Sequence, residues 1–578
     1  MLVQARRLKI NVQLPPKATF IMVALIITLG AYVVYPVILI LVNSFNVASI
    51  REPYEFSLEN WSIAFSQPRL WTAIRNTFFV YFSYTAISFP TAVLIAWLLA
   101  RTRIPFTHGF EFLFWVSFMI PGLAVTLGWI YMLDPDVGIV NKLLTFLPFV
   151  DEAVFNIYSV PGIIFVHLMG NAISAKVMLL TPAFRNMDTA LEEAAHVAGA
   201  STARTLFRVT LPVMMPALVV VFMLNVVRMF SSFETELLLG TPIRFFVYST
   251  LIYDFVRLQD PPQYGQATAL ASITLGIIAI IVPLQRWLLT RKRYTTVTGQ
   301  MRPGLISLGK WQPVATAFIV FILIMLILAP ILVLIGGSFM TRVGFFSATP
   351  LLTMKHWSAV LSDDLFVNAF KNTLLLSMST AVISPILFSI LAYILVRTNW
   401  PGRTFLDSII WMSAAVPGML ASLGLLWMFL GTPFLVPLYG TIYILVLVIV
   451  LQGKLTGSQL FKTAFLQIGQ EIEDAARVHG AGWWRTYWRI WVPLIMPTMV
   501  LIGTFNFILA ANTTASIILL ASRGTVTLSI LSLEWMIGGY GRQLENAGIL
   551  TLVIGAMTTV AAIVARKYGM KAGVRQYQ

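Results

Sequence analysis

The 578-residue sequence contains no cysteine, which excludes disulfide bonds and thiolate metal sites. Charged residues are also scarce, at 11% of the chain. The few histidines are scattered, without metal-ligand spacing or a neighbouring nucleophile motif; they are His108, His167, His196, His356 and His479. We therefore expect no catalytic residues, no metal-binding residues and no bound cofactor in this chain.

Apolar residues dominate instead. They make up 58% of the chain, and the mean hydropathy is +0.84, which predicts a polytopic membrane protein. The apolar runs are too long and too uniform for alternating barrel strands, so they should be helices. A span needs about 20 residues. We predict about twelve spans, at residues 20–44, 76–100, 110–133, 158–180, 212–239, 266–289, 313–338, 372–396, 405–430, 438–453, 493–521 and 545–565.

The net charge of +16 raises the possibility of nucleic-acid binding, but the basic residues are distributed as in a membrane protein. If the amino terminus is cytoplasmic, most of the 39 Lys and Arg residues fall in segments on the inside. The positive-inside rule therefore predicts that both termini are cytoplasmic. We expect membrane lipid around the chain and no nucleic-acid partner.

An internal duplication organises the chain. Six features recur in the same order at one constant spacing: Trp61, Asn76–Thr77, Arg101–Thr102, Pro105, Pro121–Gly122 and Gly128 return as Trp357, Asn372–Thr373, Arg397–Thr398, Pro401, Pro417–Gly418 and Gly424. An even number of spans per repeat gives both halves one orientation, related by an axis along the membrane normal. The fold class is thus an all-α polytopic membrane protein with two six-helix parallel repeats. We divide it into residues 1–290, a basic cytoplasmic linker at 291–312, and residues 313–578.

Two polar segments, here called the first elbow (residues 191–212) and the second elbow (residues 472–493), share an unusual pattern. An acid, two alanines, a glycine and a later proline have matching spacing in both; they are Glu193, Ala194, Ala195, Gly199 and Pro212, then Asp474, Ala475, Ala476, Gly480 and Pro493. The first elbow favours a helix with acids at its amino-terminal end, where the helix dipole stabilises them. A glycine in the left-handed conformation would end that helix.

This paired pattern resembles the EAA loop of binding-protein-dependent ABC importer permeases. The resemblance covers roughly residues 70–290 and 368–567 and implies the type I importer permease fold. It implies that each elbow docks on a separate ATPase subunit, that two permease halves are fused, and that two ATPase copies bind. It also implies an external or periplasmic substrate-binding protein and a place in the bacterial cytoplasmic (inner) membrane. Asp474 replaces the usual Glu, so the elbows need not be equivalent.

A nucleotide-binding motif is nearly formed in the linker. Gly304, Gly309 and Lys310 match most of a Walker A signature, but Trp311 stands where magnesium binding requires Ser or Thr. We therefore expect ATP and magnesium to bind the partner ATPase, with this chain a transport subunit and not an enzyme.

Ionisable residues at membrane depth are costly and usually functional. Arg228, Glu234 and Glu236 lie on the fifth predicted span or its outer end. One interpretation places them at a helix end among lipid headgroups. The other makes them part of an outer gate or substrate path, with Pro121 and Pro417 interrupting matching spans.

The substrate is the least constrained prediction. Fused permeases of this size are most similar to those for ferric iron, with thiamine or aminoethylphosphonate as alternatives. A ferric ion prefers oxygen ligands, and the outer side offers Glu234, Glu236, Tyr264, Glu534 and Glu545. The rival of another class is an ion-coupled secondary transporter, which would need midspan ionisable residues that this sequence almost lacks apart from Arg228.

Overall fold

The computed structural model describes residues 16–48, 52–188, 190–291, 306–413, 416–537 and 543–574. These residues are mainly helical, and extended pairing among them is limited to three isolated bridges. Nine of the described helices are long and apolar enough to cross a membrane, and the number is eleven if each of two bent pairs counts as one span. The predicted all-α polytopic fold is confirmed.

The amino-terminal half contains α1 to α14. The bounds are α1 (Pro16–Asn43), α2 (Glu59–Ser66), α3 (Pro68–Arg101), α4 (Thr107–Met119), α5 (Gly122–Leu133), α6 (Ile139–Leu144), α7 (Val160–His167), α8 (Ile173–Arg185), α9 (Ala190–Val197), α10 (Thr202–Thr205), α11 (Leu211–Arg228), α12 (Glu234–Gly240), α13 (Tyr248–Tyr253) and α14 (Tyr264–Arg291).

The carboxy-terminal half contains α15 to α27. The bounds are α15 (Gln312–Leu323), α16 (Ala329–Phe339), α17 (Lys355–Ser362), α18 (Asp364–Arg397), α19 (Arg403–Ser413), α20 (Gly418–Gly431), α21 (Ile442–Gln452), α22 (Lys454–Gln467), α23 (Glu471–Val478), α24 (Trp483–Thr486), α25 (Val492–Asn512), α26 (Leu528–Ile537) and α27 (Leu544–Val574). Most of the predicted linker lies outside the described residues.

The duplication is visible in the helix bounds. Both α3 and α18 have 34 residues, and they end at the equivalent residues Arg101 and Arg397. Each is followed by an extended threonine, and the repeated Pro105 and Pro401 stand three residues later. Proline disfavours the helical conformation in the residue before it, so the same sequence signal lies just beyond the end of both helices.

The first long helix of each half packs against the other half. Pro36 of α1 lies against Gly424 of α20, and Pro330 of α16 lies against Gly128 of α5. A Cβ atom on Gly128 would stand 2.7 Å from the backbone of Pro330, and one on Gly424 would stand 2.9 Å from the carbonyl oxygen of Pro36. Each repeated glycine therefore allows a close crossing between the halves, because any side chain there would overlap the partner helix.

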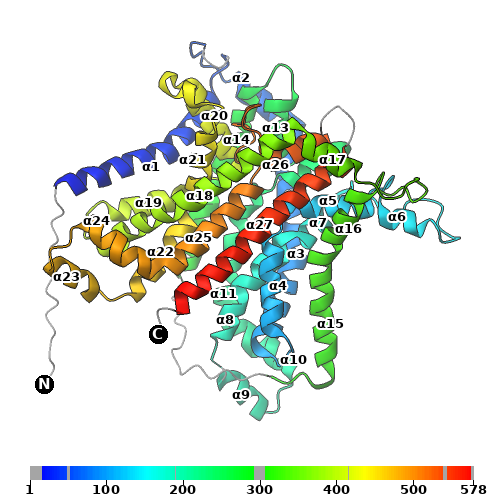
Figure 1. The fold of residues 1–578 in the computed structure, drawn as a ribbon, viewed down its shortest axis with the longest axis horizontal. Coiled ribbons are helices and arrows are strands. Elements are labelled where there is room, and N and C mark those ends of the chain that lie inside the picture. The colour runs from blue at the N-terminus through cyan, green and yellow to red at the C-terminus, as the bar shows by residue number, and fades with distance from the viewer. Residues whose placement is uncertain are drawn as a thin grey trace.

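The central helices of the two halves share one core toward one end of the molecule. Figure 1 shows α9 at the bottom and α23 at the lower left, well apart from each other. We call this side of the molecule the elbow end, and the opposite side, where α2, α13 and α20 lie at the top of the view, the distal end. Toward the distal end, one apolar core combines side chains of α5 and α12 with those of α20 and α26.

Toward the elbow end the cores are separate. One contains α3, α4, α8 and α11 with the crossing helix α15, and the other contains α18, α19, α22 and α25 with the crossing helix α1. The halves are therefore joined at the distal end and splayed at the elbow end.

Several predicted spans are irregular. The helices on either side of Pro121 meet at 91°, and those on either side of Gly453 meet at 50°. Proline has no N–H to continue the helical ladder, and the preceding Ile120 is already extended, which explains the first break. The interruption expected at Pro121 is thus confirmed. The kink expected at the equivalent Pro417 adjoins residues outside the described part, but Pro417 does precede α20 as its amino-terminal cap.

Two predicted spans are too long. The run 212–239 is not one helix, because α11 ends at Arg228 and α12 begins only at Glu234. Likewise α25 ends at Asn512, before the end predicted at residue 521. In both cases an apolar composition continues through turns, so hydropathy alone could not reveal where the helix stops.

Candidate coupling elbows and substrate path

The elbow helices α9 and α23 end just before Gly199 and Gly480, as the sequence predicts. Gly199 has φ = +81° and Gly480 has φ = +74°. After α9, the N–H of Ala200 donates to the carbonyl of Ala195 at 2.9 Å; the same bond runs from Ala481 to Ala476 at 3.0 Å. These are the backbone bonds of a Schellman motif, which requires the left-handed conformation that glycine adopts without strain. The predicted positive φ at both positions is confirmed.

Each elbow continues into a membrane helix without interruption. After the glycine turn, α10 passes through a π-helical turn at Leu206–Thr210 into α11. The second elbow repeats this with α24, a π-helical turn at Tyr487–Trp491, and α25. Pro212 and Pro493 stand in the first turn of α11 and α25, directly after the wider π-helical turns. Beyond its glycine turn, each elbow is thus joined to its membrane helix by continuous helical backbone.

The outer face of each elbow carries the predicted motif residues. Glu193 and Asp474 are exposed, as are Ala194 and Ala475, whereas Ala195 is half-buried and Ala476 is buried. Apolar side chains accompany the acids: Val197 is 90% exposed and its equivalent Val478 is 86% exposed. A surface that combines an acid, small residues and an exposed valine is suited to contact with another protein.

The inner face of the first elbow carries an ion pair that sequence analysis missed. Glu192 is 2% exposed, and its Oε2 accepts from Arg101 Nε at 3.1 Å and also from Nη2. Arg101 is itself 1% exposed, at the end of α3. Thr210 Oγ1 donates to the other carboxylate oxygen of Glu192 at 2.6 Å. The buried charge is therefore paired and hydrogen-bonded, which is the condition for tolerating it.

The second elbow holds the equivalent glutamate differently. Glu473 is 4% exposed, and its Oε1 accepts from the hydroxyl of Tyr393 at 2.6 Å and from Arg477 Nη2 at 2.7 Å. Arg477 belongs to the same helix, four residues on. Arg397, the equivalent of Arg101, instead donates to the carbonyls of Phe465 and Ile468. The signal that could have found these contacts was the acid directly before each motif, together with the repeated Arg–Thr pair.

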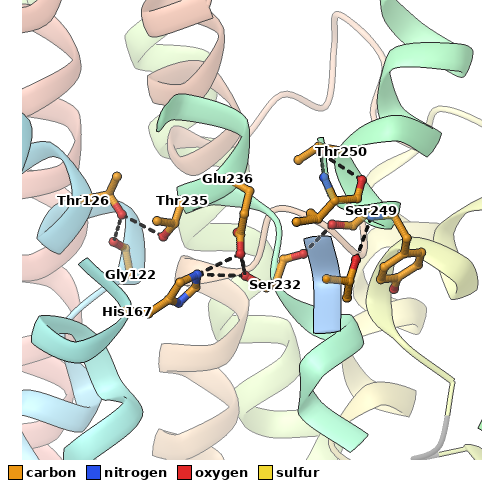
Figure 2. A network of polar contacts seen from close by, with 11 residues as sticks. Gly122, Thr126, His167, Ser232, Thr235, Glu236, Ser249 and Thr250 are labelled. Atoms are coloured by element: carbon orange, nitrogen blue, oxygen red, sulfur yellow. Dashed lines mark hydrogen bonds and ion pairs between the residues drawn. The ribbon is translucent and has the colours of Figure 1, made fainter. Parts of the chain in front are cut away.

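A buried polar network surrounds Glu236 in the first half. Figure 2 shows His167, Ser232 and Glu236 pointing toward one another: His167 Nε2 is 2.8 Å from Glu236 Oε1, and Ser232 Oγ donates to the carboxylate at 2.6 Å. Glu236 is 1% exposed, which excludes contact with headgroups. At the equivalent positions the second half has Val448 and Ile517, both buried. The network thus exists in one half only.

Glu234 lies where the halves meet. Its carboxylate is close to Thr514 and Ala515 of the second half, the segment that repeats its own position. Nearby, Arg257 donates to the carbonyls of Ile518 and Ala521 at 2.9 and 3.2 Å. Sequence analysis gave Arg257 no role, because it falls in a loop between predicted spans. Glu234 and Arg257 both touch the opposite half, as a path along the pseudosymmetry axis requires.

The remaining residues predicted to line the path have different surroundings. Glu534 lies on α26 within electrostatic reach of Arg257, and Tyr264 packs edge-on against Trp427 of the other half. Glu545, in contrast, accepts from the backbone N–H of Val343 at 2.9 Å and so secures a loop. The side chain of Arg228 lies outside the described residues. Arg228 and Glu236 do not share one helix, as the single predicted span at residues 212–239 implied, because α11 ends at Arg228 and α12 begins at Glu234.

Comparison with known proteins identifies the class. The family model described as "Binding-protein-dependent transport system inner membrane component" matches residues 70–294 and 385–566, one stretch in each half. Because these stretches cover more than half of the sequence, the chain belongs to this family of multi-pass ABC transporter membrane components. The double match confirms that two permease halves are fused.

Two curated relatives cover most of the chain. The ferric transport system permease protein FbpB of Actinobacillus pleuropneumoniae is 22% identical over 93% of this chain and 76% of its own length. The putative ferric transport system permease protein FbpB 1 of Haemophilus influenzae is 23% identical over 87% of this chain and 78% of its own. Among solved structures, a bacterial ABC transporter involved in alginate import is 19% identical, with a TM-score of 0.41 over 48% of this chain and 97% of its own.

Proposed function

We propose that this chain is the complete membrane pathway of an ATP-driven ferric iron importer. An external or periplasmic binding protein delivers the substrate at the distal end. Two copies of an ATPase subunit dock on the two elbows, which lie on the cytoplasmic side together with both termini. ATP and magnesium bind the ATPase subunits, and this chain carries out no hydrolysis.

The paired elbows are the observation that carries the proposal. Each presents exposed acids and an exposed valine and continues directly into a membrane helix. Docking of a partner there would apply force to α11 and α25 without an intervening flexible loop. Since one family match lies on each half, one docking site is expected on each half.

The separate cores support alternating access. With the distal core shared and the elbow-end cores apart, the path would be closed toward the binding protein and open toward the cytoplasm. Dimerising ATPase subunits would bring the elbows together and open the distal end. Such a rigid-body motion about an interface is a standard allosteric transition.

Ferric iron is supported by the function for which the two relatives are named and by the chemistry of the interface between the halves. Glu234 and Glu534 offer carboxylate oxygens, and Tyr264 offers a phenol, at places where a hard cation could be passed from one to the next. No group of three or more His, Asp or Glu side chains that could hold a metal ion occurs in the described part of the chain. A sparse set of oxygens suits brief contact, since tight binding would stop transport.

The test is uptake by vesicles that contain this chain, its ATPase and its binding protein. We expect labelled ferric ion to accumulate when ATP is present on the elbow side. Glu234→Gln should slow uptake because it removes a charge from the interface between the halves. Glu236→Gln should slow it as well, since the substitution disrupts the network that positions α12.

The outcomes of this experiment test the identity of the substrate and the class of transporter separately. ATP-dependent uptake of thiamine or aminoethylphosphonate, with none of iron, would overturn the iron assignment and leave the importer intact. Uptake driven by an ion gradient with no ATPase bound would instead indicate the secondary transporter.

A further inference from the structure

The two elbows are fastened to the membrane helices by different chemistry. In the first, Glu192 binds Arg101 of α3, and both side chains are almost completely buried, at 3% and 1% exposed. In the second, the partner that bears the charge is Arg477 of the elbow helix itself, which is 42% exposed. The contact from α18 is the neutral hydroxyl of Tyr393. Among the described residues, an ion pair therefore crosses between elbow and membrane helix in the first half and not in the second.

The surroundings reinforce this difference. Around Tyr393 the second half has an aromatic cluster in which Phe465, Trp483 and Trp491 lie with ring centroids 5.7 to 6.2 Å from the tyrosine. These rings meet Tyr393 edge-on, at interplanar angles of 67° to 74°, so they add apolar packing around the tyrosine but no charge that could pair with Glu473. The first half has Thr210 in place of Trp491, and its hydroxyl completes the binding of Glu192.

The backbone at Arg101 also holds a second segment. The backbone carbonyl of Arg101 accepts from the N–H of Ile306 at 2.8 Å, and the backbone N–H of Arg103 donates to the carbonyl of Ile306 at 3.1 Å. Ile306 directly precedes the turn that leads into α15, the helix of the second half that packs on the first. Movement at Arg101 therefore reaches the elbow, α3 and the crossing helix together.

We propose that Arg101 is a positioning residue that couples the first elbow to the membrane helices, and that the second elbow has no equivalent. Breaking the Arg101–Glu192 pair then uncouples ATP hydrolysis from transport, whereas loosening the second elbow changes coupling little. This inference rests on the proposed function, because coupling needs an ATPase on the elbows.

The structure supplies a matched pair of variants. Arg101→Met with His196→Arg removes the tie to α3 but gives Glu192 an arginine four residues on, as Glu473 already has in Arg477. Tyr393→Phe removes the tie to α18 and leaves the Glu473–Arg477 pair in place. Each variant therefore keeps its buried glutamate paired and lacks only the bond to the membrane helix.

The measurement is substrate transported per ATP hydrolysed in reconstituted vesicles, alongside copurification of the ATPase. We expect Arg101→Met with His196→Arg to lower this ratio by about tenfold or more while the ATPase still binds and hydrolyses ATP. Tyr393→Phe should lower it by less than about twofold. A purely structural role for Arg101 predicts a different result, because the new arginine would restore the ratio.

Two results would overturn the inference: a wild-type ratio for the Arg101 double variant, or an equal loss in Tyr393→Phe. If the double variant does not insert, Arg101→Lys provides the test. It keeps the charge but loses the forked geometry, so a ratio lowered by about threefold is expected, and an unchanged ratio overturns the inference. If no ATPase copurifies with the wild-type chain, the proposed function itself fails.

Discussion

Single residues set the shape of the elbows. The glycines at 199 and 480 have positive φ values and open surroundings, with no atom beyond the glycine and its two chain neighbours within 4 Å of the place where a Cβ atom would lie. Any cost of a side chain there therefore comes from the backbone conformation and not from crowding. Valine disfavours the left-handed region by more than about 1 kcal/mol, so the turn would open.

We accordingly expect Gly199→Val and Gly480→Val to weaken ATPase association in a pull-down. Ala198→Val is the control, since it adds the same side chain to an exposed neighbour outside the positive-φ position. Unchanged association in both glycine variants would show that the turn is not needed for docking.

The exposed acids give a second prediction at this scale. Glu193→Arg and Asp474→Arg place a positive charge at a helix amino terminus, which the helix dipole disfavours, and on the surface proposed to face the ATPase. Both residues are exposed, so insertion should be normal while transport collapses. Wild-type transport by both variants would rule out the elbows as the coupling site.

Among the elements, the crossings at Gly128 and Gly424 join the halves. We expect Gly128→Ala to lower the thermal stability of the purified protein, because the new methyl would overlap the Pro330 backbone at a cost of about 1–3 kcal/mol. Gly276→Ala, in a helix where the new methyl would have no such neighbour within 4 Å, should leave stability unchanged or raise it. A melting temperature for Gly128→Ala equal to that of wild type would mean that the helices shift apart easily.

The elements also show what the sequence can predict. The repeat in α3 and α18 and the glycine ends of the elbows are visible because proline and glycine act locally. The span predicted from residue 76 begins too late, because α3 starts at Pro68. The charge of Arg69 suggests a loop in the sequence, but in the structure Arg69 lies in the helix and pairs with Asp254 at 3.0 Å. Partners distant in sequence, such as Arg101 with Glu192, leave no local signal.

For the whole molecule, the proposed motion is measurable because the chain has no cysteine to remove. Spin labels on Ala198→Cys and His479→Cys, which are equivalent exposed positions beside the exposed valines, would report the distance between the elbows. It should shorten when ATP binds the assembled transporter, as the separate elbow-end cores approach. A second pair of labels, on Ser62→Cys of α2 and Ser358→Cys of α17, serves for comparison. The distance between these two labels should not shorten when the distance between the elbows does. An elbow distance that stays constant during transport would exclude the splayed state as part of the cycle.

The fusion of the halves has a consequence for how they diverge. In a transporter built from two identical chains, every substitution is present in both halves. A feature that is useful in one half must therefore also be present in the other. Here His167 and Glu236 can have Val448 and Ile517 as their equivalents in the other half, because each position changes alone. The covalent join also fixes the ratio of the two specialised halves at one to one, so no cell can assemble a transporter from two copies of the same side.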